Sequence, residues 1–416
     1  MIVGFSVLGV RAWPECASGR VNQGETVTVL TLRSPERLWR DRTMTQQWTR
    51  RLGFAAVAAM LVLPVGAAQA GQGWTASSVT GVTGPVSSSS DTDAWALGSA
   101  GFAHWNGSTW QQVPSPAGRG TVGAIAARGP ADAWAVGQLA TGYHISSPQI
   151  SHWDGSAWSI SPSPAISGRR AGLRGVAATG PGDAWAVGND GRYALVEHWN
   201  GTAWSRATVP APTTGEFYGS KLTAVTARSA SDVWAVGTFS HLSSEPDSLF
   251  ALHYDGTSWR VVPMAQTGSQ TNSNIPVPNA LVAVGPNDLW MVGDQSNFAS
   301  PITLTEHWDG AKWTIVPSPF DHGSDSTTSI SSGALVSVTA RASNDVWAAG
   351  ESFTFTDGDP AGVRQALLIH WDGTRWTRET APTTGTYNSV QGIATTIGGH
   401  VIWATNAGTP SLLTHN

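Results

Sequence analysis

Histidine and aspartate recur at fixed positions along this sequence, and both side chains can bind metal ions or transfer protons. Each histidine follows a largely apolar segment and is followed by an aromatic residue and then by Asp-Gly or Asn-Gly. These histidines are His104, His152, His198, His253, His307 and His370. The aspartates each stand two residues before a tryptophan; they are Asp93, Asp132, Asp183, Asp232, Asp288 and Asp345. One interpretation is a metal or ligand site in every repeat. We favour the other, a structural hydrogen bond between each histidine and its aspartate, because an active site is formed once in a molecule.

A second set of polar and aromatic residues is not repeated and lies in segments whose length varies between repeats. We predict that these residues bind the ligand: Tyr143, His144, Asp190, Arg192, His241, Asp294, Phe353, Phe355, Asp357 and Asp359. The phenylalanines could stack on a sugar ring, and Asp357 with Asp359 could join a calcium site, since calcium prefers several oxygen ligands. A solvated turn explains the two aspartates as well, so we predict neither a metal nor a cofactor. Further candidates of the same kind are Phe217, Tyr218, Glu245, Asp247, Asp321, His322 and Asp325.

The segment from residue 222 to residue 263 shows which elements position these side chains. Residues 222–227 alternate apolar with small or polar side chains, and residues 233–237, 248–254 and 257–263 are three further β-rich runs. Asp255-Gly256 separates the last two runs and is typical of a two-residue hairpin turn. One repeat therefore predicts four antiparallel strands. The tryptophans repeated in its second and fourth strands are expected to form the core.

The repeats predict a closed ring of such sheets. A four-stranded sheet cannot bury both of its faces alone, so neighbouring sheets must stack, and radial stacking produces a β-propeller. The last repeat has three strands, within residues 390–415, and residues 73–79 resemble its missing fourth strand. The alternative, an open solenoid, needs polar capping repeats, and none is visible. We therefore predict an all-β, seven-bladed β-propeller whose N-terminal strand joins the last blade.

The repeated order Asp-x-Trp-Ala-Val-Gly, Glu-His-Trp-Asp-Gly-x-x-Trp and Val-Pro-x-Pro resembles kelch repeats and the propeller of galactose oxidase-like proteins. Those families end the second strand in glycine, have an aromatic-Asp pair late in the third strand and place tryptophan in the fourth. The resemblance covers the repeat architecture of residues 71–416. Two features depart from it. The second strand ends in one glycine, as at Gly188 and Gly237, where kelch repeats have a pair, and Asp-Gly-x-x-Trp is one residue shorter than the Asp-box of sialidase-like propellers.

The enzymatic chemistries associated with these propellers are not apparent in the sequence. A galactose oxidase-type copper site requires a cysteine cross-linked to a tyrosine, but the single cysteine, Cys16, precedes residue 71. A sialidase-type site requires clustered arginines, and the sequence shows no such cluster. A carbohydrate-active hydrolase or lyase with loop carboxylates at the central opening stays open as the alternative function, because carboxylates from different loops can converge in a folded chain.

Charge and the N-terminal segment indicate where the protein acts. The chain has 23 Lys and Arg and 28 Asp and Glu, of which 8 and 4 precede residue 71, so residues 71–416 have a net charge of −9. Nucleic acid and anionic membranes are therefore poor partners. Residues 44–70 contain Arg50-Arg51, an apolar segment and Ala68-Gln69-Ala70, a pattern typical of a secretory signal peptide cleaved near Ala70. The arginine pair leaves twin-arginine export open beside the general route.

The domain organisation follows from these assignments. Residues 1–43 are expected to be an N-terminal extension from a misassigned start, residues 44–70 the signal peptide and residues 71–416 the propeller. The apolar stretch is shorter than the roughly 20 residues that span a membrane, so we expect no membrane anchor. Variable loops on a rigid scaffold are the usual place for recognition. We predict a secreted, monomeric, non-catalytic binding module that holds a glycan or an extracellular protein on its variable loops.

Overall fold

The computed structural model describes residues 74–78, 82–98, 100–164, 171–242, 247–266, 275–296, 301–320, 329–356, 359–380, 389–396, 402–406 and 411–415. The chain divides into two compact units, Met1–Pro64 and Val65–Asn416, and all described residues belong to the second. The predicted extension and signal peptide therefore lie outside the described residues. Within the ranges given, no helix is long and apolar enough to cross a membrane.

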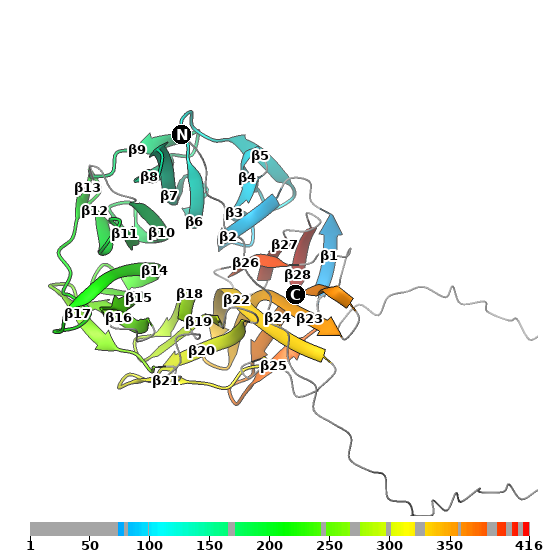
Figure 1. The fold of residues 1–416 in the computed structure, drawn as a ribbon. Helices are drawn as coiled ribbons and strands as arrows, with labels where there is room; N and C mark the ends of the chain where they lie inside the picture. Colours follow the sequence, from blue (N-terminus) through cyan, green and yellow to red (C-terminus); the bar gives the residue numbers. More distant parts are fainter. Residues whose placement is uncertain are drawn as a thin grey trace, which may run out of the picture. The chain divides into compact units, whose positions relative to one another are not determined.

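The second unit is a β-propeller of four-stranded antiparallel blades, which confirms the predicted fold class at that level (Figure 1). Six sheets each contain four strands that are consecutive in the chain. The first two sheets contain β2 (Val82–Ser90), β3 (Asp93–Gly98), β4 (Gly101–Trp105), β5 (Trp110–Pro114), β6 (Thr121–Gly129), β7 (Asp132–Gly142), β8 (Ile145–Trp153) and β9 (Trp158–Ser161). The next two contain β10 (Gly172–Gly180), β11 (Asp183–Asn189), β12 (Ala194–Trp199), β13 (Trp204–Arg206), β14 (Phe217–Ser229), β15 (Asp232–His241), β16 (Ser248–Tyr254) and β17 (Trp259–Pro263). The last two contain β18 (Ile275–Gly285), β19 (Asp288–Ser296), β20 (Ile302–Trp308), β21 (Trp313–Ile315), β22 (Ser329–Ala342), β23 (Asp345–Thr356), β24 (Asp359–Trp371) and β25 (Trp376–Glu379).

The predicted count of seven blades needs correction. The two ends of the chain pair as β1-β28-β27-β26, with β1 (Trp74–Ser78), β26 (Val390–Thr395), β27 (Ile402–Asn406) and β28 (Ser411–His415). Side chains are described in β26 but not in β1, β27 or β28, which leaves 25 strands and six complete blades. For the remaining sheet only the strand pairing is described, with Trp74 opposite His415.

The last repeat departs in sequence from the six complete blades. Each complete blade has an aspartate two residues before its second-strand tryptophan, whereas Val401 precedes Trp403 at that spacing. The last repeat therefore lacks the aspartate that pairs with histidine in the other blades.

An Asp–His–Trp contact stabilises each of the six complete blades. The histidine Nε2 lies 2.7–3.0 Å from the aspartate Oδ1, and the imidazole packs on the second-strand tryptophan with ring centroids 4.0–4.5 Å apart. In one blade, His198 bonds to Asp183 and stacks on Trp185. The structural interpretation of the repeated histidines is thus confirmed.

The tryptophans join neighbouring blades. Trp185 lies 5.0 Å from Tyr254 and 5.4 Å from Trp259 of the following sheet, measured between ring centroids. The next second-strand residue, Trp234, makes the same kind of contact with Trp308 at 5.1 Å. These second-strand rings are almost fully buried. Burial of large rings between blades explains how the described propeller is stabilised by non-covalent packing.

The first strand of each blade is the innermost one. Along the ring each of these strands contacts the next, from β2 through β6, β10, β14, β18 and β22 to β26, and β26 contacts β2 in turn. Together they surround a central channel with a volume of about 560 Å³. The connections between second and third strands open on one face of the ring, because strand direction alternates within a blade. We call this the loop face.

Candidate functional site

A bulge in the innermost strands supplies the side chains of the channel. In six of these strands the ladder with the second strand shifts register at a bulge, where one residue has no partner. The bulged residues are Gly123, Arg174, Thr223, Asn279, Val336 and Gln391. All six line the channel. The same place in the blade therefore has a different side chain in each of them.

Two of these bulged residues close the contact to the next blade. The hydroxyl of Thr223 donates to the carbonyl of Pro278, and the amide of Asn279 donates to the carbonyl of Leu335 at 2.8 Å. Arg174 occupies the equivalent position in β10 but is exposed, and its side chain forms no hydrogen bond or ion pair with the residues described. It is the one charged side chain among the six, and it is available to a ligand.

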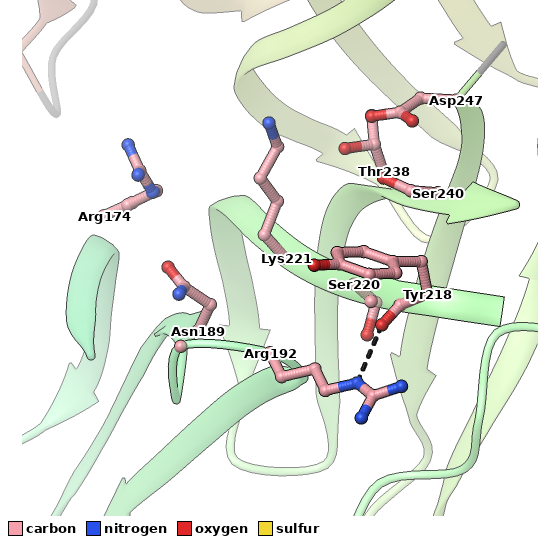
Figure 2. A pocket seen from close by; sticks show the side chains of 11 residues that line it. Arg174, Asn189, Arg192, Tyr218, Ser220, Lys221, Thr238, Ser240 and Asp247 are labelled. Carbon is pink, nitrogen blue, oxygen red and sulfur yellow. Dashed lines mark hydrogen bonds between the residues drawn. The ribbon is translucent and has the colours of Figure 1, made fainter. Parts of the chain in front are cut away.

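Arg174 also lines a pocket between the β10–β13 and β14–β17 sheets, on the loop face. The pocket has a volume of about 420 Å³, within the range of about 300–1,000 Å³ that is usual for ligand sites. Its main polar and aromatic lining residues are Arg174, Asn189, Arg192, Tyr218, Lys221 and Asp247. Figure 2 shows Arg174 and Lys221 extending into the same opening from the two sheets. We call this site the basic pocket.

The turn between β11 and β12 places Arg192 at the edge of the basic pocket. Asp190 is buried and its Oδ1 accepts hydrogen bonds from the backbone N–H groups of Arg192 at 3.1 Å and Tyr193 at 2.8 Å. Its other oxygen accepts a hydrogen bond from Arg206 at 2.9 Å. Burial alone raises the pKa of Asp190, but the hydrogen bonds from Tyr193 and Arg206 outweigh it and lower the pKa. Asp190 therefore stays ionised and holds the turn in shape.

The same turn is fixed to the neighbouring blade. Arg192 Nε donates to the carbonyl of Tyr218 at 2.8 Å, and the N–H of Ser220 donates to the carbonyl of Arg192 at 2.8 Å. Gly219 permits this approach, because a Cβ there would lie 2.7 Å from the carbonyl oxygen of Arg192. The edge of the pocket is thus formed by two blades together.

Arg192 and two tyrosines form a ridge beside the basic pocket. The guanidinium carbon lies 5.3 Å from the ring centroid of Tyr193 and 5.8 Å from that of Tyr218. Tyr218 is 67% exposed and Tyr193 is 39% exposed. On the outer side of the ridge, Tyr193 and Phe217 line a second pocket of about 550 Å³, together with residues 207–212. The ridge therefore presents aromatic rings to solvent between two concave surfaces.

The structure brings together few of the residues predicted as binding residues. Arg192 lines the basic pocket together with the further candidates Tyr218 and Asp247, and Asp190 supports the turn that holds Arg192. His241 lies at the end of β15, where its Nε2 is 2.8 Å from Ser248 Oγ. Asp294 is 8% exposed and accepts a hydrogen bond from Asn279 at 2.9 Å, so it acts within the channel wall.

The other predicted residues are distributed over different blades. Tyr143 is 89% exposed in the β7–β8 connection, where its ring lies 3.8 Å from that of His144, and His144 has a positive φ of 60°. Phe353 lies under Arg364, whose guanidinium carbon is 4.4 Å from the ring centroid. Three predicted residues lie outside the described side chains: Phe355, Asp357 and Asp359. The same holds for Glu245, Asp321, His322 and Asp325.

Neither Arg174 nor Lys221 is among the predicted binding residues, and the sequence showed no cluster of arginines. The two residues come from different blades, and neighbouring blades bring them together with Arg192. A signal was present in the repeats, because Arg174 is the one charged residue at a position where other blades have Gly, Thr, Asn, Val or Gln. Shared residues identify the scaffold of the repeat, whereas this position differs from blade to blade.

Two glutamates have strongly raised pKa values, as an acid catalyst would, but neither can reach a substrate. Burial raises the pKa of Glu197 to about 7 and that of Glu306 to about 8, and both side chains are 0% exposed. Glu197 accepts a hydrogen bond from Ser163 at 2.9 Å, and Glu306 accepts one from the N–H of Ala265 at 3.2 Å. Each glutamate thus fixes the segment that arrives from the preceding blade. In the described part of the chain no three His, Cys, Asp or Glu side chains are grouped so that they could hold a metal ion.

Comparison with known proteins shows the fold. No protein-family model matches the chain, and no curated protein matches it. Among solved structures, this chain is similar to U3-55K, with a TM-score of 0.53 and 11% sequence identity. The match covers 82% of this chain and 98% of the U3-55K chain. The WD40 repeats of RRP9 have a TM-score of 0.53 at 11% identity, covering 83% and 98%. The extracellular domain of the one-component system BT4673 from B. thetaiotaomicron has a TM-score of 0.51 at 11% identity, covering 82% of this chain and 40% of that one. At these identities the likeness establishes a β-propeller and does not extend to function.

Proposed function

We propose that this protein is a secreted, non-catalytic β-propeller that binds an extracellular glycan on its loop face. The observation that supports this most strongly is the ridge formed by Arg192 with the exposed rings of Tyr193 and Tyr218 between two pockets. Aromatic rings stack on the apolar faces of sugars, and nearby polar groups hydrogen-bond to hydroxyls. The kelch-like repeat and export by the signal peptide of residues 44–70 belong to the same proposal.

The polar lining of the basic pocket suits sugar hydroxyls. Asn189, Ser240 and Thr238 contribute amide and hydroxyl groups, which can both donate and accept hydrogen bonds. The backbone around them belongs to regular strands and to the Asp190 turn, so the binding groups are held before the ligand arrives. Such preorganisation lowers the entropy cost of binding.

Binding without bond cleavage agrees with the positions of the acidic residues. The two glutamates whose pKa values would suit a general acid near neutral pH are fully buried in the blades. Asp247 is the one carboxylate among the residues that line the described basic pocket. Hydrolysis by a pair of carboxylates requires two such groups on either side of the scissile bond.

The test is to measure binding of the purified protein to an array of bacterial and plant polysaccharides, followed by product analysis of every hit. We expect binding without shortening of the glycan, and we expect Tyr218→Ala to weaken it. Tyr143→Ala is the matched control, because it removes an exposed tyrosine from another blade. Cleavage of a bound glycan contradicts the non-catalytic proposal. Absence of binding to every polysaccharide contradicts the glycan proposal and directs the search to protein partners.

A further inference from the structure

We infer that the basic pocket selects an acidic glycan, with a carboxylate or sulfate group of the sugar held between Arg174 and Lys221. This inference rests on the proposed function and names the class of glycan. It concerns residues that come from adjacent innermost strands, β10 and β14, at the place where the central channel opens on the loop face.

The charge of this region is opposite to that of the chain. The whole chain has a formal net charge of −5, yet Arg174, Arg192 and Lys221 line one pocket with a single described carboxylate, Asp247. Like charges that gather in one pocket repel each other, which costs free energy unless an anion binds there. A binding role accounts for that cost, whereas the packing of the blades does not require these cations.

Two of the three cations have no described partner of their own. Arg192 donates from Nε to the carbonyl of Tyr218, which fixes its direction. Arg174 and Lys221, in contrast, make no side-chain hydrogen bond or ion pair within the part of the chain that the structure describes. Their donors are therefore available, and a guanidinium and an ammonium group together provide several N–H donors for one carboxylate or sulfate.

The two cations border two hollows at once. Arg174 and Lys221 line the basic pocket and also an adjoining hollow of about 370 Å³ at the channel mouth, where Gln138 and Asn279 are further lining residues. An acidic group between the two cations would thus have space on both sides for the neighbouring sugars of a chain. The uncharged amides around it suit sugar hydroxyls better than further anionic groups.

Matched pairs of polysaccharides test the inference directly. The carboxylate pair is polygalacturonate and its methyl-esterified form, and the sulfate pair is dextran sulfate and dextran. We expect at least one acidic member to bind about tenfold or more tightly than its neutral partner. We also expect this binding to weaken as ionic strength rises from about 20 to 300 mM, because salt screens exposed charges. The pair that shows the difference identifies the acidic group.

Variants then locate the anion. Arg174→Gln and Lys221→Gln are each expected to weaken binding of the acidic member about tenfold, because each removes a charge-assisted contact. The controls Arg375→Gln and Lys312→Gln remove the same charges from exposed turns between third and fourth strands, on the opposite face, and should leave affinity unchanged. Melting temperatures of all four variants show whether each one is folded.

Several results would overturn the inference, and they differ in what they mean for the proposed function. Equal binding of the acidic and neutral members, or unchanged affinity in both Arg174→Gln and Lys221→Gln, refutes acidic selection and leaves glycan binding intact. Tighter binding of poly-glutamate than of either acidic glycan refutes it in favour of an acidic protein segment. If none of the four polysaccharides binds, acidic selection is refuted. Glycan binding itself is refuted only if the neutral glycans of the array are not bound either.

Discussion

The two ends of each blade differ in how closely they follow the repeat. At the end where the second strand begins, six blades have the same Asp–His–Trp contact, with Nε2–Oδ1 distances of 2.7–3.0 Å. At the end toward the loop face, the bulged residue of the first strand differs from blade to blade, and so does the connection between second and third strands. Arg174 and Asn279 occupy equivalent places, yet one is exposed and the other hydrogen-bonds to the next blade.

The difference arises from what each end must contact. Every blade packs on a neighbour through its tryptophans, so the residues that support those rings are constrained in the same way throughout. A bulged residue faces the channel, where packing imposes no common side chain. The residues repeated in every blade therefore stabilise the fold. A specific ligand can be bound at the positions whose residue differs from blade to blade.

The largest expected effect comes from removing a strand of the repeated framework. Deletion of residues 71–79 removes β1 and leaves the edge of β28 unpaired. We expect the melting temperature to fall by roughly 10 °C or more and aggregation to increase, since 1 kcal/mol corresponds to a few degrees in a domain of this size. Calorimetry and light scattering measure both. A truncated protein that melts like the parent would show that this pairing does not stabilise the ring.

A smaller effect is expected from the buried glutamate of β20, and it depends on pH. Burial raises the pKa of Glu306 to about 8 in the folded protein, from a value near 4.5 in the unfolded chain. The neutral acid therefore contributes its full stability below pH 4.5, and this contribution is lost as the pH rises through 8. Glu306→Gln should therefore be more stable than the parent at pH 9, on the order of a few kcal/mol, and similar at pH 5. Urea denaturation at the two pH values measures this.

The exposed Glu216 provides the control for this experiment. Glu216→Gln removes a carboxylate from the surface and should change the free energy of unfolding by less than about 0.5 kcal/mol. A Glu306→Gln variant that is less stable than the parent at pH 9 would contradict the assignment of a neutral, buried acid.

Removing one repeated histidine should affect stability and leave binding unchanged. His198→Ala removes the hydrogen bond to Asp183 and the stacking on Trp185, so we expect a loss of about 1–3 kcal/mol in the free energy of unfolding. Affinity for the glycan should stay the same. Lost affinity at unchanged stability would place this histidine in the binding site and break the distinction between the two ends of the blade.

The smallest effect on stability is expected on the loop face. Tyr218 is 67% exposed, so Tyr218→Ala should change the free energy of unfolding by less than about 0.5 kcal/mol. Loss of a stacking surface should nevertheless weaken glycan affinity several-fold to about tenfold. Calorimetric titration beside a thermal melt separates the two quantities. Equal affinity for the variant and the parent would remove the ridge from the site.

The sequence was sufficient to predict the propeller and the role of the repeated side chains. Alternation, Asp-Gly turns and regularly spaced tryptophans are local signals, and the paired strands and Asp–His contacts confirm them. The blade count was wrong, because the repeated tryptophans predict seven blades and the structure shows six, with 25 strands.

The candidate site was predicted only in part, at Arg192 with its supporting Asp190 and at the further candidates Tyr218 and Asp247. Arg174 and Lys221 meet because consecutive blades are adjacent in space, a relation that no single repeat displays. The hydrogen bond from Arg192 to Tyr218 likewise joins two blades. Periodicity identifies what a blade needs for itself, whereas a site between blades depends on the angle and approach of neighbours.

The most direct test of the central claim is to titrate one acidic polysaccharide into Arg174→Gln and His198→Ala side by side, with a thermal melt of each. The account predicts opposite results: Arg174→Gln loses about tenfold in affinity at an unchanged melting temperature, and His198→Ala loses several degrees at unchanged affinity. The reverse pattern, or loss of affinity in both variants, would contradict the separation of a repeated scaffold from a single binding site on the loop face.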